Sequence, residues 1–183
     1  MQELIDYTAG VVPNNRWDDL RSLDYRQDTI ILRSWLATLL TREAPAVGVV
    51  AYWFGIFNPI VNDTDSCGFY VSGSRERYKP GSDWACWKPG AYVPQGRYAP
   101  SQVLPLLYRT AINVEDPERL GEYTLCLGYV CLVVADLVRY LDPPLLVGKA
   151  TERTVAVGFD SGDQIFLGSL TSTGWSPAVS NPR

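Results

Sequence analysis

A long charge-free apolar run in this 183-residue chain, Tyr123–Ala135 (YTLCLGYVCLVVA), leaves few choices of fold. It is well short of the roughly 20 residues that a helix needs to span a bilayer. Its apolar side chains surround most of a helix, so exposing it would leave a large apolar patch on the surface. We therefore expect a long helix that starts near Asp116, has Pro117 in its first turn and is buried at the centre of a core.

Two further patterns predict a helix and a pair of strands. Apolar residues recur at helical spacing over 28–43, and Asp28 is placed to cap the free amides at its start. Residues 49–57 are rich in β-branched and aromatic side chains and predict a strand that is buried on both faces. Residues 68–72 predict a second strand, so the two strands form a hairpin with a long connection.

The second half of the chain predicts another helix and another hairpin. A helix begins at Pro100 or Ser101, and strands 154–159 and 164–170 flank the turn sequence DSGD. This order of elements favours an α+β fold, with an antiparallel sheet that helices cover on one face. We expect a single domain over 1–183, with an irregular lead-in at 1–27, an aromatic proline-rich loop at 74–100 and a frayed tail at 176–183.

The charge balance argues against nucleic acid as a partner. The net charge is −4, and the isoelectric point is about 4.8. Binding to a phosphate backbone usually requires clustered Lys and Arg. The tightest basic group, Arg75, Arg77 and Lys79, is interrupted by Glu76 and is typical of a solvated loop.

The cysteines and the N-terminus favour a cytoplasmic protein without a membrane partner. The cysteines form no CxxC pair, and the first residues lack the basic start and apolar run of a secretory signal. Reduced thiols of this kind usually behave as small core residues. Cys126 and Cys131 point about 140° apart on one expected helix, so they cannot share a metal.

The absence of histidine carries the most functional information. It removes Ser-His-Asp and Cys-His mechanisms and nearly all catalytic zinc or iron sites. Only Lys79, Lys88 and Lys149 supply lysine, and no glycine-rich phosphate loop is present. We expect a protein that is not an enzyme and that holds no cofactor or metal.

Two catalytic alternatives remain for a chain without histidine. Cys86 lies near Lys88, but Asp83 would raise its pKa and no imidazole can take its proton, so an inert thiol is favoured. Asp83, Asp160 and Asp163 could serve a carboxylate-based hydrolase, in which an acid and a base flank a glycosidic bond. Asp160 and Asp163 alone do not fill a calcium shell, and DSGD is also an ordinary turn.

The aromatic loop is the main candidate for partner binding. Trp, Tyr and Arg dominate the energetic centres of protein interfaces, and the prolines of this loop stiffen its backbone. The same rings could instead fold back over the sheet, or bind a carbohydrate or another small molecule. A second candidate surface is acidic, and its neighbouring arginines partly cancel its charge. The partner-binding candidates are Asp83, Trp84, Trp87, Tyr92, Arg97 and Tyr98 in the loop and Asp18, Asp19 and Asp24 in the lead-in.

Several segments together carry a resemblance: LRSWLATLL, AYWFGIF, FYVSGS followed by DWAC, and VAVGFDSGDQIFLG. In this pattern the chain resembles the small acidic immunity proteins that bacteria encode beside polymorphic or contact-delivered toxins. The resemblance implies a protein that binds a cognate toxin in the cytosol and blocks its active site or its substrate entry. Many such toxins are basic, so an acidic inhibitor would be steered towards its target.

Overall fold

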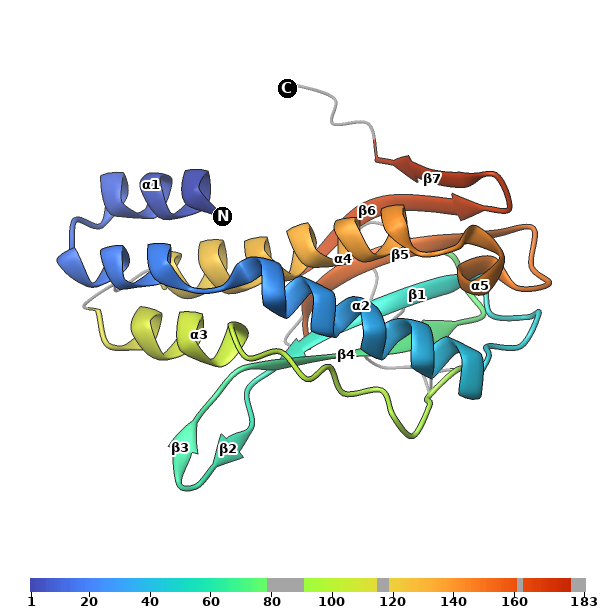
Figure 1. Ribbon diagram of the computed structural model, residues 1–183, viewed down its shortest axis with the longest axis horizontal. Helices are drawn as coiled ribbons and strands as arrows, with labels where there is room; N and C mark the ends of the chain where they lie inside the picture. The colour runs from blue at the N-terminus through green and yellow to red at the C-terminus, as the bar shows by residue number, and fades with distance from the viewer. Residues whose placement is uncertain (79–90, 115–118, 161–162, 179–183) are drawn as a thin grey trace.

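The computed structural model describes residues 1–78, 91–114, 119–160 and 163–178 (Figure 1). A five-stranded sheet forms one layer and the helices form the other, which confirms the α+β class. The helical elements are α1 (Gln2–Val11), η1 (Asn15–Ser22), α2 (Tyr25–Arg42), α3 (Leu104–Ile112), the π-helical segment η2 (Glu122–Leu127), α4 (Gly128–Tyr140) and α5 (Pro143–Val147). The strands are β1 (Ala51–Phe57), β2 (Ile60–Val61), β3 (Thr64–Asp65), β4 (Gly68–Ser74), β5 (Glu152–Phe159), β6 (Gln164–Thr171) and β7 (Gly174–Pro177).

The strand order in the sheet is β4-β1-β5-β6-β7, and both expected hairpins are present. The sheet is mixed, because β1 and β5 run parallel with Phe54 opposite Val157. Parallel neighbours require a crossover connection, and the chain between β4 and β5 provides one through α3, α4 and α5. The expectation of a wholly antiparallel sheet is therefore corrected at this one pair.

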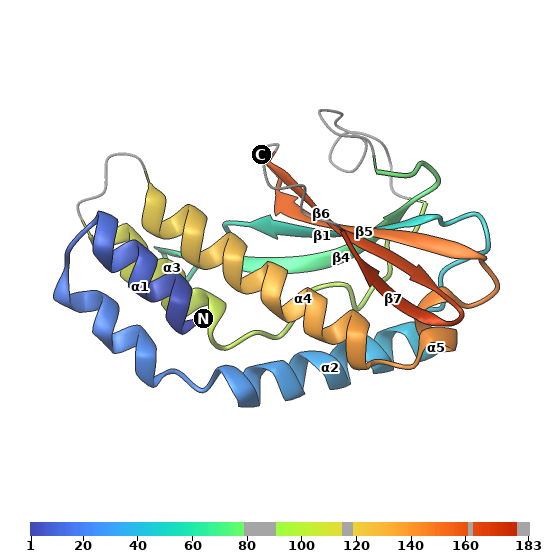
Figure 2. The ribbon, with the colours of Figure 1, turned by 90° about the horizontal axis from the view of Figure 1, so that it is seen from above.

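The helices lie on one face of the sheet, as expected (Figure 2). The main core forms between them and that face, where Leu36 of α2 and Val134 of α4 are almost completely buried with Phe54 of β1. The opposite face carries a smaller apolar cluster around Trp53 and Ala156. Trp53 has no exposed surface, so β1 is buried on both faces.

The lead-in at 1–27 is helical rather than irregular. Ile5 on α1 and Trp17 on η1 are completely buried, and the Trp17 indole donates a hydrogen bond to the Val12 carbonyl at 2.7 Å. The Asn14 side chain accepts from the Arg16 amide and caps η1. Tertiary burial therefore stabilises two short helical segments that local propensity did not indicate.

Helix α2 begins slightly earlier than expected, and its cap is Asp24. The Asp24 side chain accepts a hydrogen bond from the Gln27 amide at 2.9 Å. Asp28, the expected cap, lies one turn inside the helix and is 2% exposed. The correction follows from tertiary structure, because Asp28 is used to bind two other segments, as described below.

The apolar run forms η2 and α4. Glu122–Tyr140 is long and apolar enough to cross a membrane by length and composition, and half of its most apolar window is buried inside the protein. Leu125, Val130 and Leu137 have no exposed surface. These contacts are those of a core helix, and the expected start at Asp116 lies outside the described residues.

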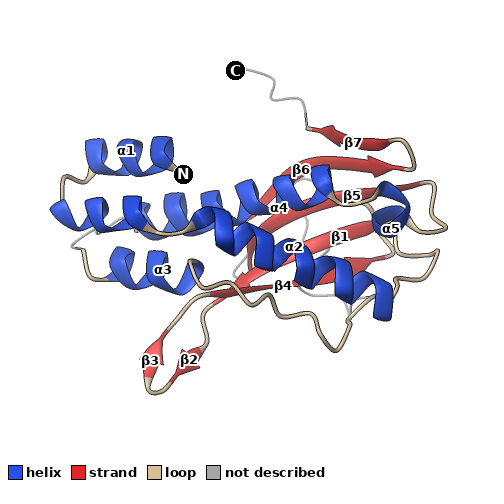
Figure 3. Ribbon diagram, in the orientation of Figure 1, coloured by secondary structure: helices blue, strands red, loops and turns tan. Residues whose placement is uncertain are grey.

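The connection between β1 and β4 is itself a small hairpin, β2–β3, which projects from the body (Figure 3). Its turn residues Asn62 and Asp63 have φ values of 51° and 57°. Two successive positive φ values are characteristic of a type I′ turn, which matches the twist of a tight hairpin.

Candidate functional site

Residues 91–99 run along the free edge of β4. Tyr92 and Gly73 exchange two backbone hydrogen bonds, and the Val71 amide donates to the Arg97 carbonyl at 3.0 Å. The Ala99 amide donates to the Phe69 carbonyl at 2.9 Å. This part of the expected loop is therefore fixed along the sheet, and it covers an edge strand that would otherwise expose unpaired backbone groups.

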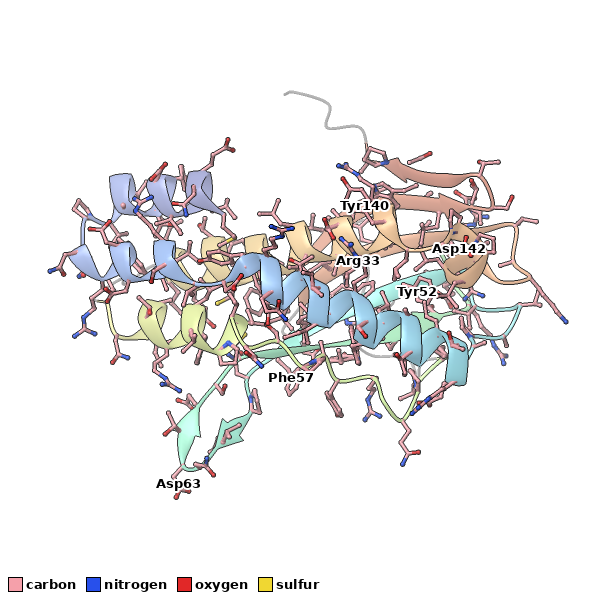
Figure 4. All side chains as sticks on the ribbon, viewed as in Figure 1. Arg33, Tyr52, Phe57, Asp63, Tyr140 and Asp142 are labelled. Atoms are coloured by element: carbon pink, nitrogen blue, oxygen red, sulfur yellow. The ribbon has the colours of Figure 1, made fainter. Side chains whose placement is uncertain are left out.

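Three rings gather where this segment crosses β4, and we call Phe57, Tyr70 and Tyr98 the aromatic cluster. The ring centroids lie 5.4 Å apart for Phe57 and Tyr98, 6.0 Å for Phe57 and Tyr70, and 6.3 Å for Tyr70 and Tyr98. Phe57 closes β1 at the base of the projecting hairpin, whose tip carries Asp63 (Figure 4). Tyr98 remains 52% exposed, so the cluster presents a ring to solvent.

Arg97 lies over the exposed ring. Its guanidinium carbon is 4.6 Å from the centroid of Tyr98, and Nη2 donates to the Tyr98 hydroxyl at 3.0 Å. Nη1 donates to the Pro94 carbonyl at 3.3 Å. The structure thus brings together two of the predicted partner-binding residues, Arg97 and Tyr98, and holds them in one arrangement.

Glycines in the two neighbouring strands make room for the rings. A Cβ on Gly55 would lie 2.6 Å from the ring of Tyr70, and one on Gly68 would lie 3.1 Å from the ring of Phe57. Because Gly55 and Gly68 carry no side chain, Tyr70 and Phe57 can lie close against the sheet. The local sequences FGIF and CGFY therefore shape the floor of the aromatic cluster.

Asp160 adds a carboxylate to the cluster. It follows β5, and its amide donates to the Ile56 carbonyl at 3.0 Å, which continues the parallel ladder beside the end of β1. Its Oδ1 accepts from the Tyr70 hydroxyl at 2.8 Å. Partial burial raises the pKa of Asp160, and hydrogen bonds from Tyr70 and Trp53 oppose that rise. The site can accept hydrogen bonds and attract a cation beside its rings.

The second carboxylate of the expected hydrolase, Asp163, engages a different part of the protein. Partial burial raises the pKa of Tyr123, and the neighbouring Asp163 adds to that rise. Tyr123 packs on Phe159, which belongs to the main core, whereas Asp160 binds Tyr70 on the opposite face. The two carboxylates do not converge on one group.

Tyr92, expected at a binding surface, is buried. It is 8% exposed, and its ring packs edge-on against Tyr52 at 6.4 Å. Tyr92 and Tyr98 are separated along β4, because Tyr92 lies opposite Gly73 while Tyr98 lies opposite Tyr70. Tyr92 is corrected to a core residue.

The acidic residues of the lead-in do not join the aromatic cluster. Asp24 caps α2, and Asp18 pairs with Arg21 at 3.1 Å, an arginine that also binds Asp6. Asp19 is exposed. One arginine, Arg21, thus binds two of the carboxylates of this region, and a third serves as a helix cap. Asp83, Trp84, Cys86 and Trp87 lie outside the described residues.

Two kinds of reactive chemistry find no support in the part of the chain that the structure describes. No group of three or more Cys, Asp or Glu side chains is placed to hold a metal there. Burial raises the pKa of the Cys131 thiol to about 12, and the neighbouring Cys67 thiol and burial raise that of Cys126. Buried thiols with raised pKa values are poor nucleophiles.

Sequence reasoning missed Phe57 and Tyr70 as members of the site. Both were assigned only to strands, and no local pattern indicates which strand ends meet. The single available signal was the glycine beside each ring, in FGIF and CGFY. Comparisons with protein-family models, with curated proteins and with solved structures each gave no match.

Proposed function

We propose that this protein is a non-enzymatic binding protein, and that the aromatic cluster with Arg97 and Asp160 is its contact surface. The observation that carries the proposal is the state of Tyr98, which is half exposed although ring contacts and the neighbouring backbone bonds to β4 hold it in place. A ring that is fixed before binding loses little conformational entropy on binding. Tyr and Arg are also the residue types that most often dominate binding energy.

A binding role also agrees with the chemistry that the chain lacks. It contains no histidine to move protons at neutral pH. Asp160 has a raised pKa but lacks a second carboxylate on the same group, because Asp163 engages Tyr123 instead. A desolvated carboxylate beside aromatic rings is suited to meeting a cationic side chain of a partner.

The most specific form of the proposal is an immunity protein that inhibits a cognate bacterial toxin in the cytoplasm. Its support is the resemblance described above, together with the net charge of −4. A basic toxin would be steered towards an acidic protein and would place Lys or Arg near Asp160. The partner in this proposal is a protein.

A second candidate function is carbohydrate binding. The observation that favours it is the hydrogen bond from Tyr70 to Asp160 beside the exposed ring of Tyr98. Sugar rings stack on aromatic side chains, and their hydroxyl groups donate hydrogen bonds to carboxylates. Titration of the protein with a panel of oligosaccharides, followed by calorimetry, separates this candidate from a protein partner.

The test of the first candidate is co-expression with the product of the adjacent gene. The proposal predicts that this product is toxic alone, that the protein restores growth, and that Tyr98→Ala abolishes the rescue. Tyr7→Ala is the matched control, because Tyr7 is 57% exposed on α1 and is remote in sequence from the cluster. A harmless neighbouring product that does not bind the protein, or full rescue by Tyr98→Ala, would contradict the proposal.

A further inference from the structure

A second site lies at the other end of β1, around a buried arginine. Arg153 of β5 has no exposed surface. Its Nε donates to the Val147 carbonyl at 3.1 Å, and Nη2 faces the carbonyls of Pro45 at 3.5 Å and Ala46 at 3.4 Å. Its guanidinium carbon lies 5.2 Å from the ring centroid of Tyr52. These partners are neutral.

The charge of Arg153 is therefore uncompensated by any ion pair within the described ranges. Taking a cation out of water is costly unless an opposite charge or strong hydrogen bonds replace the lost hydration. Burial accordingly lowers the pKa of Arg153, and the neighbouring Tyr52 and Tyr92 oppose that change. A small negative charge next to the guanidinium would offset this cost.

Two buried polar groups of this region also have no hydrogen-bond partner among the residues that the structure describes: Nη1 of Arg153 and the hydroxyl of Tyr92. Both residues lie beside Tyr52, since the ring of Tyr92 packs edge-on against it at 6.4 Å. The Tyr52 hydroxyl donates to the Leu146 carbonyl at 2.7 Å, so its proton is not free to bind the Tyr92 oxygen. Buried polar groups are rarely left unpaired in native proteins.

We propose that Nη1 of Arg153 and the hydroxyl of Tyr92 donate hydrogen bonds to one small monovalent anion, of the size and charge of chloride. An N–H donor that carries positive charge and an O–H donor are complementary to an anion and not to a cation. The site is separate from the aromatic cluster, since Tyr52 and Phe57 lie at opposite ends of β1 (Figure 4).

The surroundings restrict the anion in size and charge. Arg153 and Tyr92 are 0% and 8% exposed, so a bulky oxyanion would have to displace the chain at Pro45 and Ala46. A negative charge already lies near Tyr92. Burial raises the pKa of Tyr92, and Tyr52 and the Glu43 carboxylate raise it further. Glu43 itself accepts hydrogen bonds from the amides of residues 95 and 96, and its charge disfavours a multivalent anion.

The test is thermal unfolding of the full chain at constant ionic strength, in sodium chloride or bromide against sodium gluconate, whose anion is too large for the site. We expect the unfolding midpoint to rise saturably by about 3 °C in the small halides. Tyr92→Phe keeps the ring and removes the hydroxyl, so it should lose most of this rise. Tyr25→Phe, the same change at a hydroxyl that donates to the Leu20 carbonyl, should retain it.

Two further measurements make the outcome decisive. Arg153→Met should abolish the halide-dependent rise, and if that variant does not fold, Tyr92→Phe decides alone. In crystals grown with bromide, an anomalous peak is expected between Arg153 and Tyr92. Equal midpoints in chloride and gluconate, an undiminished halide effect in Tyr92→Phe, or no bromide at this position would overturn the proposal.

Discussion

The Tyr129 hydroxyl on α4 donates a hydrogen bond to the Asp28 carboxylate inside α2, although the two residues are 101 positions apart. The same carboxylate accepts from the Ser101 hydroxyl and from the Gln102 amide, each at 2.6 Å. One buried carboxylate thus joins α2, α4 and the segment that leads into α3. That segment follows directly after residues 91–99, so Asp28 also anchors the chain that carries Tyr98.

Asp28→Ala is expected to lower the free energy of unfolding by about 3 kcal/mol, because it leaves the buried Tyr129 hydroxyl, the Ser101 hydroxyl and the Gln102 amide without their acceptor. Chemical denaturation measures the change. Asp19→Ala removes an exposed carboxylate and should stay within about 0.5 kcal/mol of the wild type. Equal stability of the two variants would show that the Asp28 hydrogen bonds contribute nothing net to folding.

Gly158→Ala is expected to destabilise the sheet by about 2–3 kcal/mol through overpacking. A Cβ on Gly158 would lie 1.7 Å from the backbone oxygen of Asp163 and 2.6 Å from the ring of Trp53. Gly10→Ala on α1 is the matched control, because no atom lies within 4 Å of its added Cβ. That change should stabilise the protein by about 0.5 kcal/mol through helix propensity, so the two alanine variants should move in opposite directions on denaturation.

The stability of the protein should fall in alkaline solution, in part through Cys131. Burial raises the pKa of this thiol from 9.0 to about 12. The unfolded chain releases the proton near pH 9 while the folded chain still holds it, so the free energy of unfolding decreases as pH rises from about 9 to 12. The Cys131 contribution reaches at most about 1.4 kcal/mol per pH unit.

Cys131→Ala should flatten this dependence, and denaturation at pH 8 and pH 10.5 measures the difference. The stability at pH 8, which lies below the pKa of the thiol in both the unfolded and the folded chain, serves as the reference for each protein. An unchanged alkaline slope in Cys131→Ala would mean that the thiol is more exposed in solution than in the structure, where it is partly buried.

Much of the fold follows from local patterns, and the exceptions have physical causes. The observed bounds of α2, β1, β5 and β6 lie within three residues of the ranges that the sequence predicts. The parallel pairing of β1 with β5 was not predictable, because strand neighbours are set by packing of the whole sheet. The helices at 1–27 were missed because their stability depends on the distant core that buries Ile5 and Trp17.

The site was predictable only in part. Arg97 and Tyr98 were expected at a binding surface, and the structure places them together with Tyr98 exposed. Tyr92 was expected at the same surface but is buried, because the pairing of its segment with β4 directs its side chain into the core. Residue type alone does not reveal this orientation. Asp160 meets Tyr70 because of the strand arrangement. Asp160 follows the end of β5, which runs parallel to β1, and β1 pairs on its other side with β4, the strand that carries Tyr70.

The segment that carries Tyr98 should loosen when Glu43 is changed. Its carboxylate accepts hydrogen bonds from the Gln95 amide at 2.6 Å and the Gly96 amide at 3.1 Å. In Glu43→Ala we expect the protection of these two amides against hydrogen exchange to fall by about tenfold, the loss of one charge-assisted hydrogen bond. The Tyr92 amide, which donates to Gly73, is the internal control. Unchanged protection at Gln95 and Gly96 would rule out this tether.

The central claim is that the protein acts by binding through Tyr98, and the affinity of its protein partner for two alanine variants tests it most directly. Calorimetric titration should give a dissociation constant about 30-fold weaker for Tyr98→Ala than for the wild type, a loss typical of an interface centre. Tyr7→Ala, with a ring of similar exposure on α1, should bind like the wild type. Equal affinities for Tyr98→Ala and Tyr7→Ala would contradict the account.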